Sequence, residues 1–319
     1  MSRRARGLLI ALTLPVILAL AWRMDLTPTR AEMGEVVSAV RSAVAPRIDQ
    51  VRPVPSWSNV YLLMLENRNP EEIVGAADAP FINELIARGA VATNVWAVAS
   101  ASQPNYLALT SGSTHFVTSN DVVDIAAPSI FDQLDTAGLG WRVFAESVPP
   151  GCFTGAEAPG TEGPGTYTRA HVPAISYTAI SGSPQRCANI GPLGAFEPGV
   201  AAFEMIIPDS CHNTHSCPVA AGDAWLAGFV PRILESPGFA ESGLLVITFD
   251  GGSDAGPNDQ HRLATIMVGA GVRPGTVSDV RYDHYNTLRT LQEGLGVPCL
   301  DRSCEAQTMA DLFAVAEGP

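Results

Sequence analysis

Residues 60–67 read Val-Tyr-Leu-Leu-Met-Leu-Glu-Asn, an apolar run that ends abruptly in two polar residues. A continuous apolar run of this length is typical of a β-strand that is covered on both faces. Glu66 and Asn67 follow directly after its last apolar residue. The stretch therefore predicts a buried strand that delivers polar side chains to one edge of a sheet.

Further apolar runs along the chain alternate with segments of helical periodicity. The predicted strands are 60–65, 94–98, 141–144, 203–207, 244–249 and 265–268. The predicted helices are 80–88, 129–137, 224–234 and 285–295. Such alternation predicts an α/β fold, a three-layer α/β/α sandwich with a largely parallel central sheet.

Three of the predicted strands end in an acidic residue, and these residues are Glu66, Asp209 and Asp250. In a parallel α/β sheet, the ligand site lies outside the carboxyl ends of the strands. A single acid at such a place is often a helix cap, but three from distant parts of the chain favour a metal site.

Ser102 opens a predicted helix that runs from Ser102-Gln-Pro-Asn-Tyr to Gly112. Ser102 is placed as an N-cap, Pro104 is tolerated in the first turn, and Gly112 supplies the stop. A hydroxyl there faces free backbone N–H groups, which favour an anion such as a phosphoryl group. We therefore consider Ser102 either a nucleophile or only a helix cap.

Two histidines, His212 and His215, lie between Cys211 and Cys217. Together with Asp209 they offer ligands suited to Zn²⁺, Mn²⁺ or Fe. His284 stands alone at a predicted helix start. Histidine is also the usual general acid near neutral pH, so the residue types leave both roles open.

The N-terminus has the pattern of an export signal. Arg3, Arg4 and Arg6 precede an apolar run over 7–22. Near the end of this run, Ala19-Leu20-Ala21 has the small-x-small form of a cleavage site. We predict a signal peptide or an uncleaved anchor over 1–24, a linker over 25–58 and a catalytic domain over 59–319, with loop insertions at about 149–200. The predicted location is secreted or in the cell envelope.

Six cysteines agree with export, because an even count is typical of disulfide-bonded secreted proteins. Close spacing suggests local bonds for Cys211 with Cys217 and for Cys299 with Cys304, while Cys152 and Cys187 are the remaining candidates.

The formal charge of −13 argues against a nucleic-acid partner, because phosphate backbones need a basic surface. Beyond the N-terminal run, we predict no membrane span.

These segments together resemble a bacterial and fungal phosphoesterase family that includes secreted acid phosphatases and phospholipase C-like enzymes, within the alkaline-phosphatase-like superfamily. Glu66-Asn67-Arg68 resembles the opening motif of this family, and Ser102 to Gly112 resembles its nucleophile segment. His171 stands in a segment similar to Lys-His-Asn-Pro. The resemblance runs from about Val60 to Gly296.

The resemblance implies a hydrolase of phosphoric esters, with a phosphoserine intermediate, one or two divalent metals and a small phosphorylated substrate. The implied metal ligands are Glu66, Asn67, Ser102, Asp250, Asp209 and His215. The implied catalytic residues are Ser102, Asn105 and His284, and the implied substrate-binding residues are Asn120, His171 and His212.

One departure from the family stands beside Asp250. The family usually has an acidic residue at the next position, where this chain has Gly251. Asp254 or His261 could replace the missing ligand. The alternative reading is a catalytically weakened or inactive envelope protein that binds its ligand on the same fold.

Overall fold

The computed structural model describes residues 54–253 and 261–314. The predicted leader and most of the predicted linker lie outside these residues, as does Asp254. At the end of the predicted linker, Val54 and Trp57 are buried in the core. The Trp57 indole donates a hydrogen bond to the Ala270 carbonyl, so the chain is already packed before the first strand begins.

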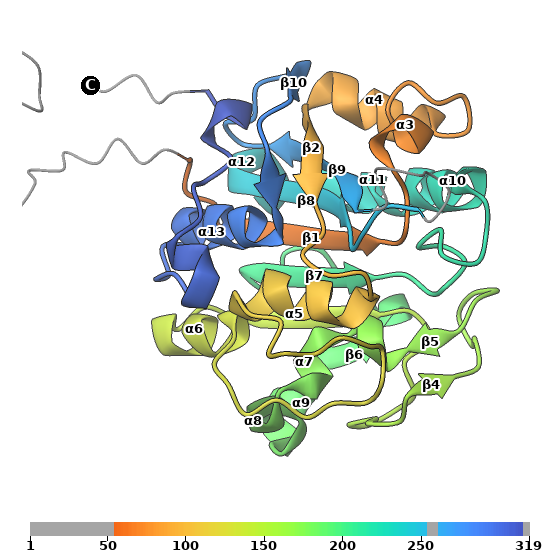
Figure 1. The fold of residues 1–319 in the computed structure, drawn as a ribbon, viewed down its shortest axis with the longest axis vertical. Coiled ribbons are helices and arrows are strands. Elements are labelled where there is room, and N and C mark those ends of the chain that lie inside the picture. Colours follow the sequence, from red (N-terminus) through yellow and green to blue (C-terminus); the bar gives the residue numbers. More distant parts are fainter. Residues whose placement is uncertain (1–53, 254–260, 315–319) are drawn as a thin grey trace, which may run out of the picture. The chain divides into compact units, whose positions relative to one another are not determined.

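A nine-stranded mixed sheet forms the centre of the described domain, in the order β10-β2-β9-β8-β1-β7-β3-β6, with β11 beside β2 (Figure 1). Its strands are β1 (Asn59–Leu65), β2 (Ala90–Trp96), β3 (Trp141–Ala145), β6 (Ile190–Pro192), β7 (Phe203–Ile207), β8 (Gly243–Phe249), β9 (Arg262–Gly269), β10 (Thr276–Ser278) and β11 (Tyr282–Asp283). Only β9 pairs antiparallel with its neighbours, β2 and β8. The prediction of a largely parallel sheet is confirmed.

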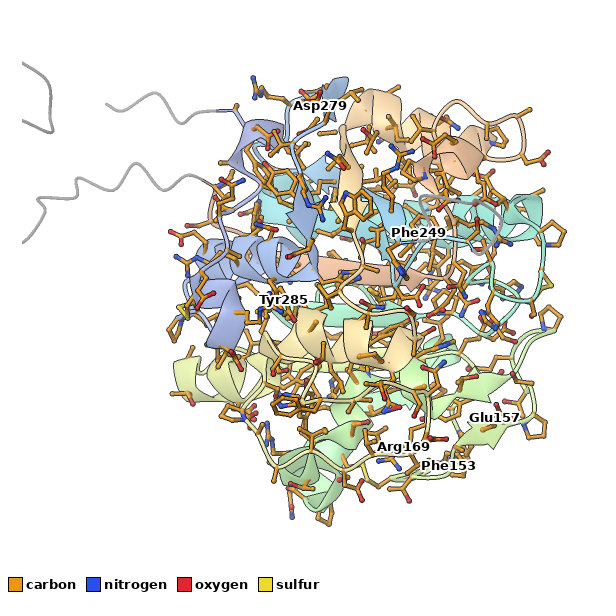
Figure 2. The ribbon with its side chains drawn as sticks, in the orientation of Figure 1. Phe153, Glu157, Arg169, Phe249, Asp279 and Tyr285 are labelled. Atoms are coloured by element: carbon orange, nitrogen blue, oxygen red, sulfur yellow. A yellow bond between two sulfur atoms is a disulfide. The ribbon has the colours of Figure 1, made fainter. Side chains whose placement is uncertain are left out.

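Two sets of helices flank the sheet (Figure 1). One set consists of α5 (Ser102–Ser111), α6 (Ile130–Ala137) and α13 (His284–Leu295). The other consists of α3 (Pro70–Ile73), α4 (Pro80–Arg88), α10 (Val219–Phe229), α11 (Pro231–Leu234) and α12 (Pro237–Ser242). Most side chains of the central strands are buried between these layers, and Figure 2 labels one of them, Phe249.

The segment 149–200 leaves the sheet and returns to it as short elements. These are the hairpin β4 (Glu157–Ala158) and β5 (Tyr167–Thr168), then α7 (Pro173–Ser176), α8 (Thr178–Ser181) and α9 (Pro184–Cys187). This segment also contains the 3₁₀ turns η1 (Arg169–His171) and η2 (Leu193–Ala195), whereas η3 (Asp301–Cys304) and η4 (Ala310–Leu312) follow α13. The buried Arg169 holds this segment, because its guanidinium donates to the Thr154, Val123 and Ile175 carbonyls and pairs with Asp124.

All six cysteines form disulfides, in the pairs Cys152–Cys187, Cys211–Cys217 and Cys299–Cys304. The two local bonds suggested by spacing are therefore confirmed. Within the described part of the chain, no helix combines the length and the apolar character needed to cross a membrane.

Two predicted elements differ from the structure. The strand predicted at 94–98 lies at Ala90–Trp96, because its pairing with β9 and β10 begins at Ala90. The helix predicted at 224–234 begins earlier, at Val219, and is interrupted between Phe229 and Pro231. Proline lacks a backbone N–H and clashes with the preceding turn, so Pro231 starts a new short helix.

Candidate active site

Glu66 and Asp250 lie side by side at the carboxyl edge of the sheet. Their strands β1 and β8 are parallel neighbours, with Leu65 opposite Phe249. Both side chains are almost fully buried. Burial raises the pKa of Glu66 well above its ordinary value, and the nearby Asp250 carboxyl raises this pKa further. The carboxyl edge of the sheet therefore holds two closely spaced acids away from solvent.

Ser102 reaches the same edge from β2, at the first position of α5. Its hydroxyl donates a hydrogen bond to Glu66 Oε2 over 3.0 Å. The prediction that Ser102 caps the helix is wrong, because Ala101 holds the cap position and the Ser102 hydroxyl caps no backbone N–H. The Ser102 hydroxyl binds Glu66 instead, so it lies directly beside the acidic pair Glu66 and Asp250.

The two asparagines near Ser102 hold the loop and helix that carry it. Asn105 Oδ1 accepts the N–H groups of Val98 and Ala99, and its amide nitrogen donates to the Ala99 and Ala101 carbonyls. Asn120 Oδ1 accepts the Gln103 N–H at the start of α5. Asn105 thus shapes the loop from beneath, whereas Asn120 is exposed beside the serine.

A cavity of about 190 Å³ opens above Ser102. It is lined by Asn67, Ala99, Ser100, Ala101, Ser102, Asn120, His215, Gly251, Gly252 and His261. A cavity of this size suits a small polar group such as a phosphoryl group. His261, one of the two suggested substitutes for an acid at position 251, lies on its wall.

His215 and His171 lie near different oxygens of the Glu66 carboxylate, and their rings are 6.1 Å apart between centroids. His215 Nδ1 lies 2.8 Å from the Asn67 amide nitrogen and 3.9 Å from Glu66 Oε2. His171 Nε2 lies 3.4 Å from Glu66 Oε1. Burial lowers the pKa of His171 to about 4, against the opposing effect of Asp250. His171 is therefore neutral at pH 7 and cannot offset the charge of the carboxylates.

His284 lies behind the site, fully buried at the start of α13. Its Nε2 lies 2.7 Å from the Asp250 carbonyl oxygen, which makes Nε2 the protonated nitrogen that donates. Burial lowers the pKa of His284. Its contact is with the backbone of Asp250, and it does not line the cavity above Ser102.

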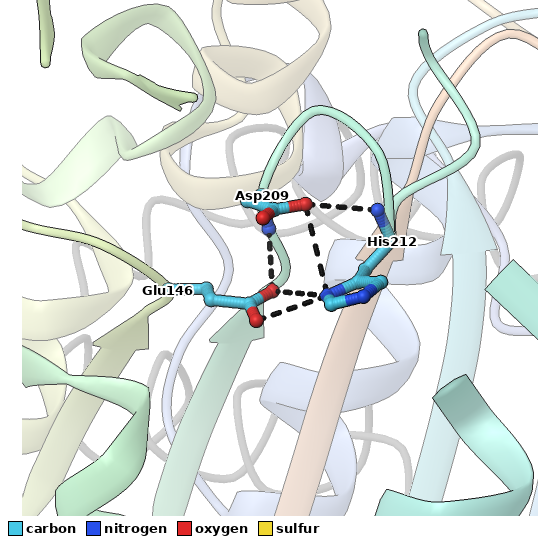
Figure 3. Close-up of side chains that lie close together, drawn as sticks. All are labelled: Glu146, Asp209 and His212. Atoms are coloured by element: carbon cyan, nitrogen blue, oxygen red, sulfur yellow. Dashed lines mark hydrogen bonds and ion pairs between the residues drawn. The ribbon is translucent and has the colours of Figure 1, made fainter. Parts of the chain in front are cut away.

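Asp209 and His212 belong to a second cluster, together with Glu146 at the end of β3 (Figure 3). His212 Nδ1 lies 2.9 Å from both Glu146 carboxylate oxygens. The Asp209 carboxylate accepts the backbone N–H groups of Gly165, Cys211 and His212. Asp209 and His215 were predicted to act together, but the structure places them in different clusters.

The Glu66–Asp250 site fits a divalent cation. Two buried carboxylates without a counter-charge are costly, and among the described residues no arginine pairs with either one. The donors present are carboxylate, amide and hydroxyl oxygens with an imidazole nearby, a set that binds divalent metals. Glu66, Asp250, Ser102 and Asn67 are the residues that would hold the ion.

Two residues of these clusters were missed in the sequence. Tyr106 donates to Glu66 Oε1 over 2.6 Å, and Glu146 accepts the Asp209 N–H. Glu146 follows the predicted strand 141–144 after one residue, so the rule that identified the other strand-end acids applies to it. For Tyr106 the sequence offered one indication. It stands four residues after Ser102 in a predicted helix, which puts both side chains on the same helix face.

The sequence profile of the Phosphoesterase family matches residues 72–298. A Phosphatidylinositol-3-phosphatase of Mycobacterium tuberculosis is 32% identical over 262 residues, which cover 82% of this chain and 84% of that protein. A Probable acid phosphatase of Kluyveromyces lactis is 29% identical over 285 residues, which cover 85% of this chain and 63% of that longer protein.

A solved structure from Vibrio parahaemolyticus, described as a protein in the alkaline phosphatase superfamily, has a similar fold. The TM-score is 0.53, the identity is 13%, and the match covers 82% of this chain and 73% of that one. At this identity the likeness concerns the fold alone, and it agrees with the predicted α/β sandwich.

Proposed function

Because this chain belongs to the Phosphoesterase family and is a hydrolase of phosphoric ester bonds, we propose that it is an exported, metal-dependent phosphatase whose nucleophile is Ser102. The observation that carries this proposal is the hydrogen bond of 3.0 Å from the Ser102 hydroxyl to the buried Glu66 carboxylate, beneath a small polar cavity. A nucleophile next to a proton acceptor is the arrangement that covalent catalysis requires.

The reaction proceeds in two displacements at phosphorus. The Ser102 oxygen forms a bond to phosphorus as its proton passes to Glu66, and the bond from phosphorus to the alcohol oxygen breaks. Water then gives a proton to His215 as it attacks the phosphoserine, the bond from phosphorus to the Ser102 oxygen breaks, and Glu66 returns its proton to that oxygen as phosphate leaves. A divalent ion bound at Glu66 and Asp250 would stabilise the serine alkoxide and neutralise charge on the phosphoryl oxygens.

His215 is the histidine best placed to protonate the leaving alcohol. It lines the cavity and is about half exposed. To act as an acid, His215 carries a proton on both ring nitrogens, and the Asn67 amide then turns its oxygen toward Nδ1 to accept that proton's hydrogen bond. The exposed Asn120 amide can hold a phosphoryl oxygen from the other side of Ser102.

Monoesters are the proposed substrates, because the names of the Mycobacterium tuberculosis and Kluyveromyces lactis relatives are those of phosphatases. Export is supported by the three disulfides and by the leader-like N-terminal sequence. A catalytically silent binding protein is the second candidate, and the absence of an acid at Gly251 favours it.

Turnover of p-nitrophenyl phosphate and of bis(p-nitrophenyl) phosphate, with and without added Zn²⁺, Mn²⁺ or Ca²⁺, tests the proposal. We expect monoester hydrolysis that chelation abolishes and that Ser102→Ala lowers by about three orders of magnitude or more. Ser111→Ala, at the other end of the same helix, is the control and keeps full activity. Unchanged turnover in Ser102→Ala would exclude Ser102 as the nucleophile. No turnover by the wild type with any of these metals would favour the catalytically silent binding protein.

A further inference from the structure

Tyr106 lies in the middle of α5 and is fully buried. Its hydroxyl donates to Glu66 Oε1 over 2.6 Å. Its ring stacks on the His171 imidazole, with the ring centroids 5.4 Å apart and the planes inclined by 11°. The side chain therefore contacts one acid and one histidine of the candidate site without lining the cavity itself.

Ser102 and Tyr106 are four residues apart in one helix, so their side chains lie on the same helix face. They bind different oxygens of the same carboxylate, Ser102 at Oε2 and Tyr106 at Oε1. Rotation of the Glu66 carboxylate breaks at least one of these bonds. The helix thus carries both the proposed nucleophile and a second group that fixes the acid facing it.

We propose that Tyr106 is a positioning residue that holds Glu66 in the orientation needed to bind the metal and to face Ser102. This inference rests on the proposed function, since it concerns the same acid. Hydrogen-bond partners that lie behind metal ligands orient them, and their loss typically costs on the order of 10- to 100-fold in metal affinity or activity.

Removal of the hydroxyl leaves Glu66 Oε1 without its short hydrogen bond, while His171 Nε2 stays 3.4 Å away. The carboxylate can then turn toward His171 and away from Ser102. A phenylalanine keeps the ring that stacks on His171, so the change acts on the hydrogen bond and preserves the packing of α5.

Tyr177, which precedes α8 and packs against α5, offers a matched control. It is fully buried, and its hydroxyl lies 2.7 Å from the Thr110 hydroxyl, near the end of α5 that is remote from Ser102. Tyr177→Phe also removes one buried phenolic hydroxyl that contacts α5, but it leaves the contacts of Glu66 intact.

The experiment compares wild type, Tyr106→Phe and Tyr177→Phe by calorimetric titration of the metal-free proteins with Mn²⁺ or Zn²⁺. Melting temperature and p-nitrophenyl phosphate kinetics are measured in parallel. We expect Tyr106→Phe to weaken metal binding about tenfold and to lower kcat by 10- to 100-fold with little change in KM. Tyr177→Phe should lower the melting temperature while it retains metal affinity and kcat.

Equal metal affinity in Tyr106→Phe and wild type, with a melting temperature lowered as in Tyr177→Phe, overturns the proposal and leaves Tyr106 a structural residue. A different outcome would contradict the proposed function, namely a wild type that binds metal but hydrolyses no ester. In that case the comparison of metal affinities still decides the role of Tyr106. A wild type that binds neither metal overturns both.

Discussion

The backbone N–H of Asn67 donates a hydrogen bond to the Asp250 carboxylate over 3.0 Å, across a sequence separation of 183 residues. Asn67 adopts a left-handed conformation with φ of 51°, which turns the chain as it leaves β1. Asp250 directly follows Phe249, the residue of the neighbouring strand β8 that lies opposite Leu65, so Asp250 comes beside Glu66 and one step before Asn67. The backbone N–H that follows strand β1 thus binds the carboxylate that follows strand β8. Gly251, the residue after Asp250, lines the cavity above Ser102.

Gly251→Asp should add a metal ligand at that position. Among the described residues, a Cβ on Gly251 would meet only the Ala97 Cβ, at 3.8 Å, so these residues leave room for a side chain. A further carboxylate raises the charge of the ligand set, and we expect metal affinity to rise on the order of tenfold. Calorimetric titration of the metal-free variant measures the change.

Gly251→Ala is the control for side-chain bulk and should leave the affinity near that of wild type. A third buried carboxylate without a cation is costly, so Gly251→Asp should melt at a lower temperature than wild type when chelated and at a higher one when metal-saturated. Weaker metal binding in Gly251→Asp contradicts the placement of the ion between Glu66 and Asp250.

The sheet edge could be predicted from the sequence because buried strands carry a local signal. Val60–Leu65 and Leu244–Phe249 are continuous apolar runs, and the acids after them fall at the ends of β1 and β8. Parallel pairing then brings distant residues together without further information. The predicted helix at 80–88 matches α4 for the same reason, since its apolar residues recur with helical spacing.

The grouping of residues around that edge could not be predicted, because it depends on which strands become neighbours. Asp209 follows β7, which lies between β1 and β3. Its backbone N–H donates to Glu146, and its carboxylate accepts the Gly165 N–H. His215, six residues later, turns toward Glu66. Both residues were expected to have the same role, whereas tertiary packing separates them.

Reduction of the Cys211–Cys217 bond should impair activity because this loop carries His215. By the chain-entropy relation, a disulfide that closes so short a loop adds about 2 kcal/mol to the free energy of unfolding. Arg68 adds to the restraint, since its guanidinium donates to the Thr214 and Cys217 carbonyls. We expect Cys211→Ser with Cys217→Ser to lower the stability by about this amount and kcat about tenfold.

Cys299→Ser with Cys304→Ser is the matched control, because that bond closes a loop of similar length away from the cavity. It should cost similar stability and leave kcat unchanged. Denaturant unfolding and monoester turnover measure both double variants. Equal activity in the two would show that His215 does not need the constraint of the loop.

Glu204 should make the stability of the fold depend on pH. It is fully buried in β7, where its Oε1 accepts the Gly199 and Ala201 N–H groups. Burial raises the pKa of Glu204 from 4.5 to about 7. The folded state therefore binds a proton more tightly than the unfolded chain, and this contribution is lost as the pH rises from about 4.5 to 7.

Glu204→Gln removes this titration, so the difference in stability between wild type and variant should change by about 2–3 kcal/mol between pH 4.5 and 7.5. Wild type should lose stability relative to the variant as the pH rises. Urea unfolding at several pH values measures the difference, with Glu157→Gln on the exposed hairpin as control. Parallel pH profiles for wild type and Glu204→Gln would rule out a raised pKa.

Asp209→Asn should destabilise the protein without removing a metal ion. The Asp209 carboxylate accepts three backbone N–H groups, and an amide in its place presents a donor to at least one of them. We expect a loss of about 1–3 kcal/mol, because buried donors are left without an acceptor. Glu66→Gln, in contrast, should bind metal weakly. Metal content after dialysis and denaturant unfolding distinguish the two variants. If Asp209→Asn loses one equivalent of metal, the cluster of Glu146, Asp209 and His212 holds a second cation, and its hydrogen bonds represent the metal-free form.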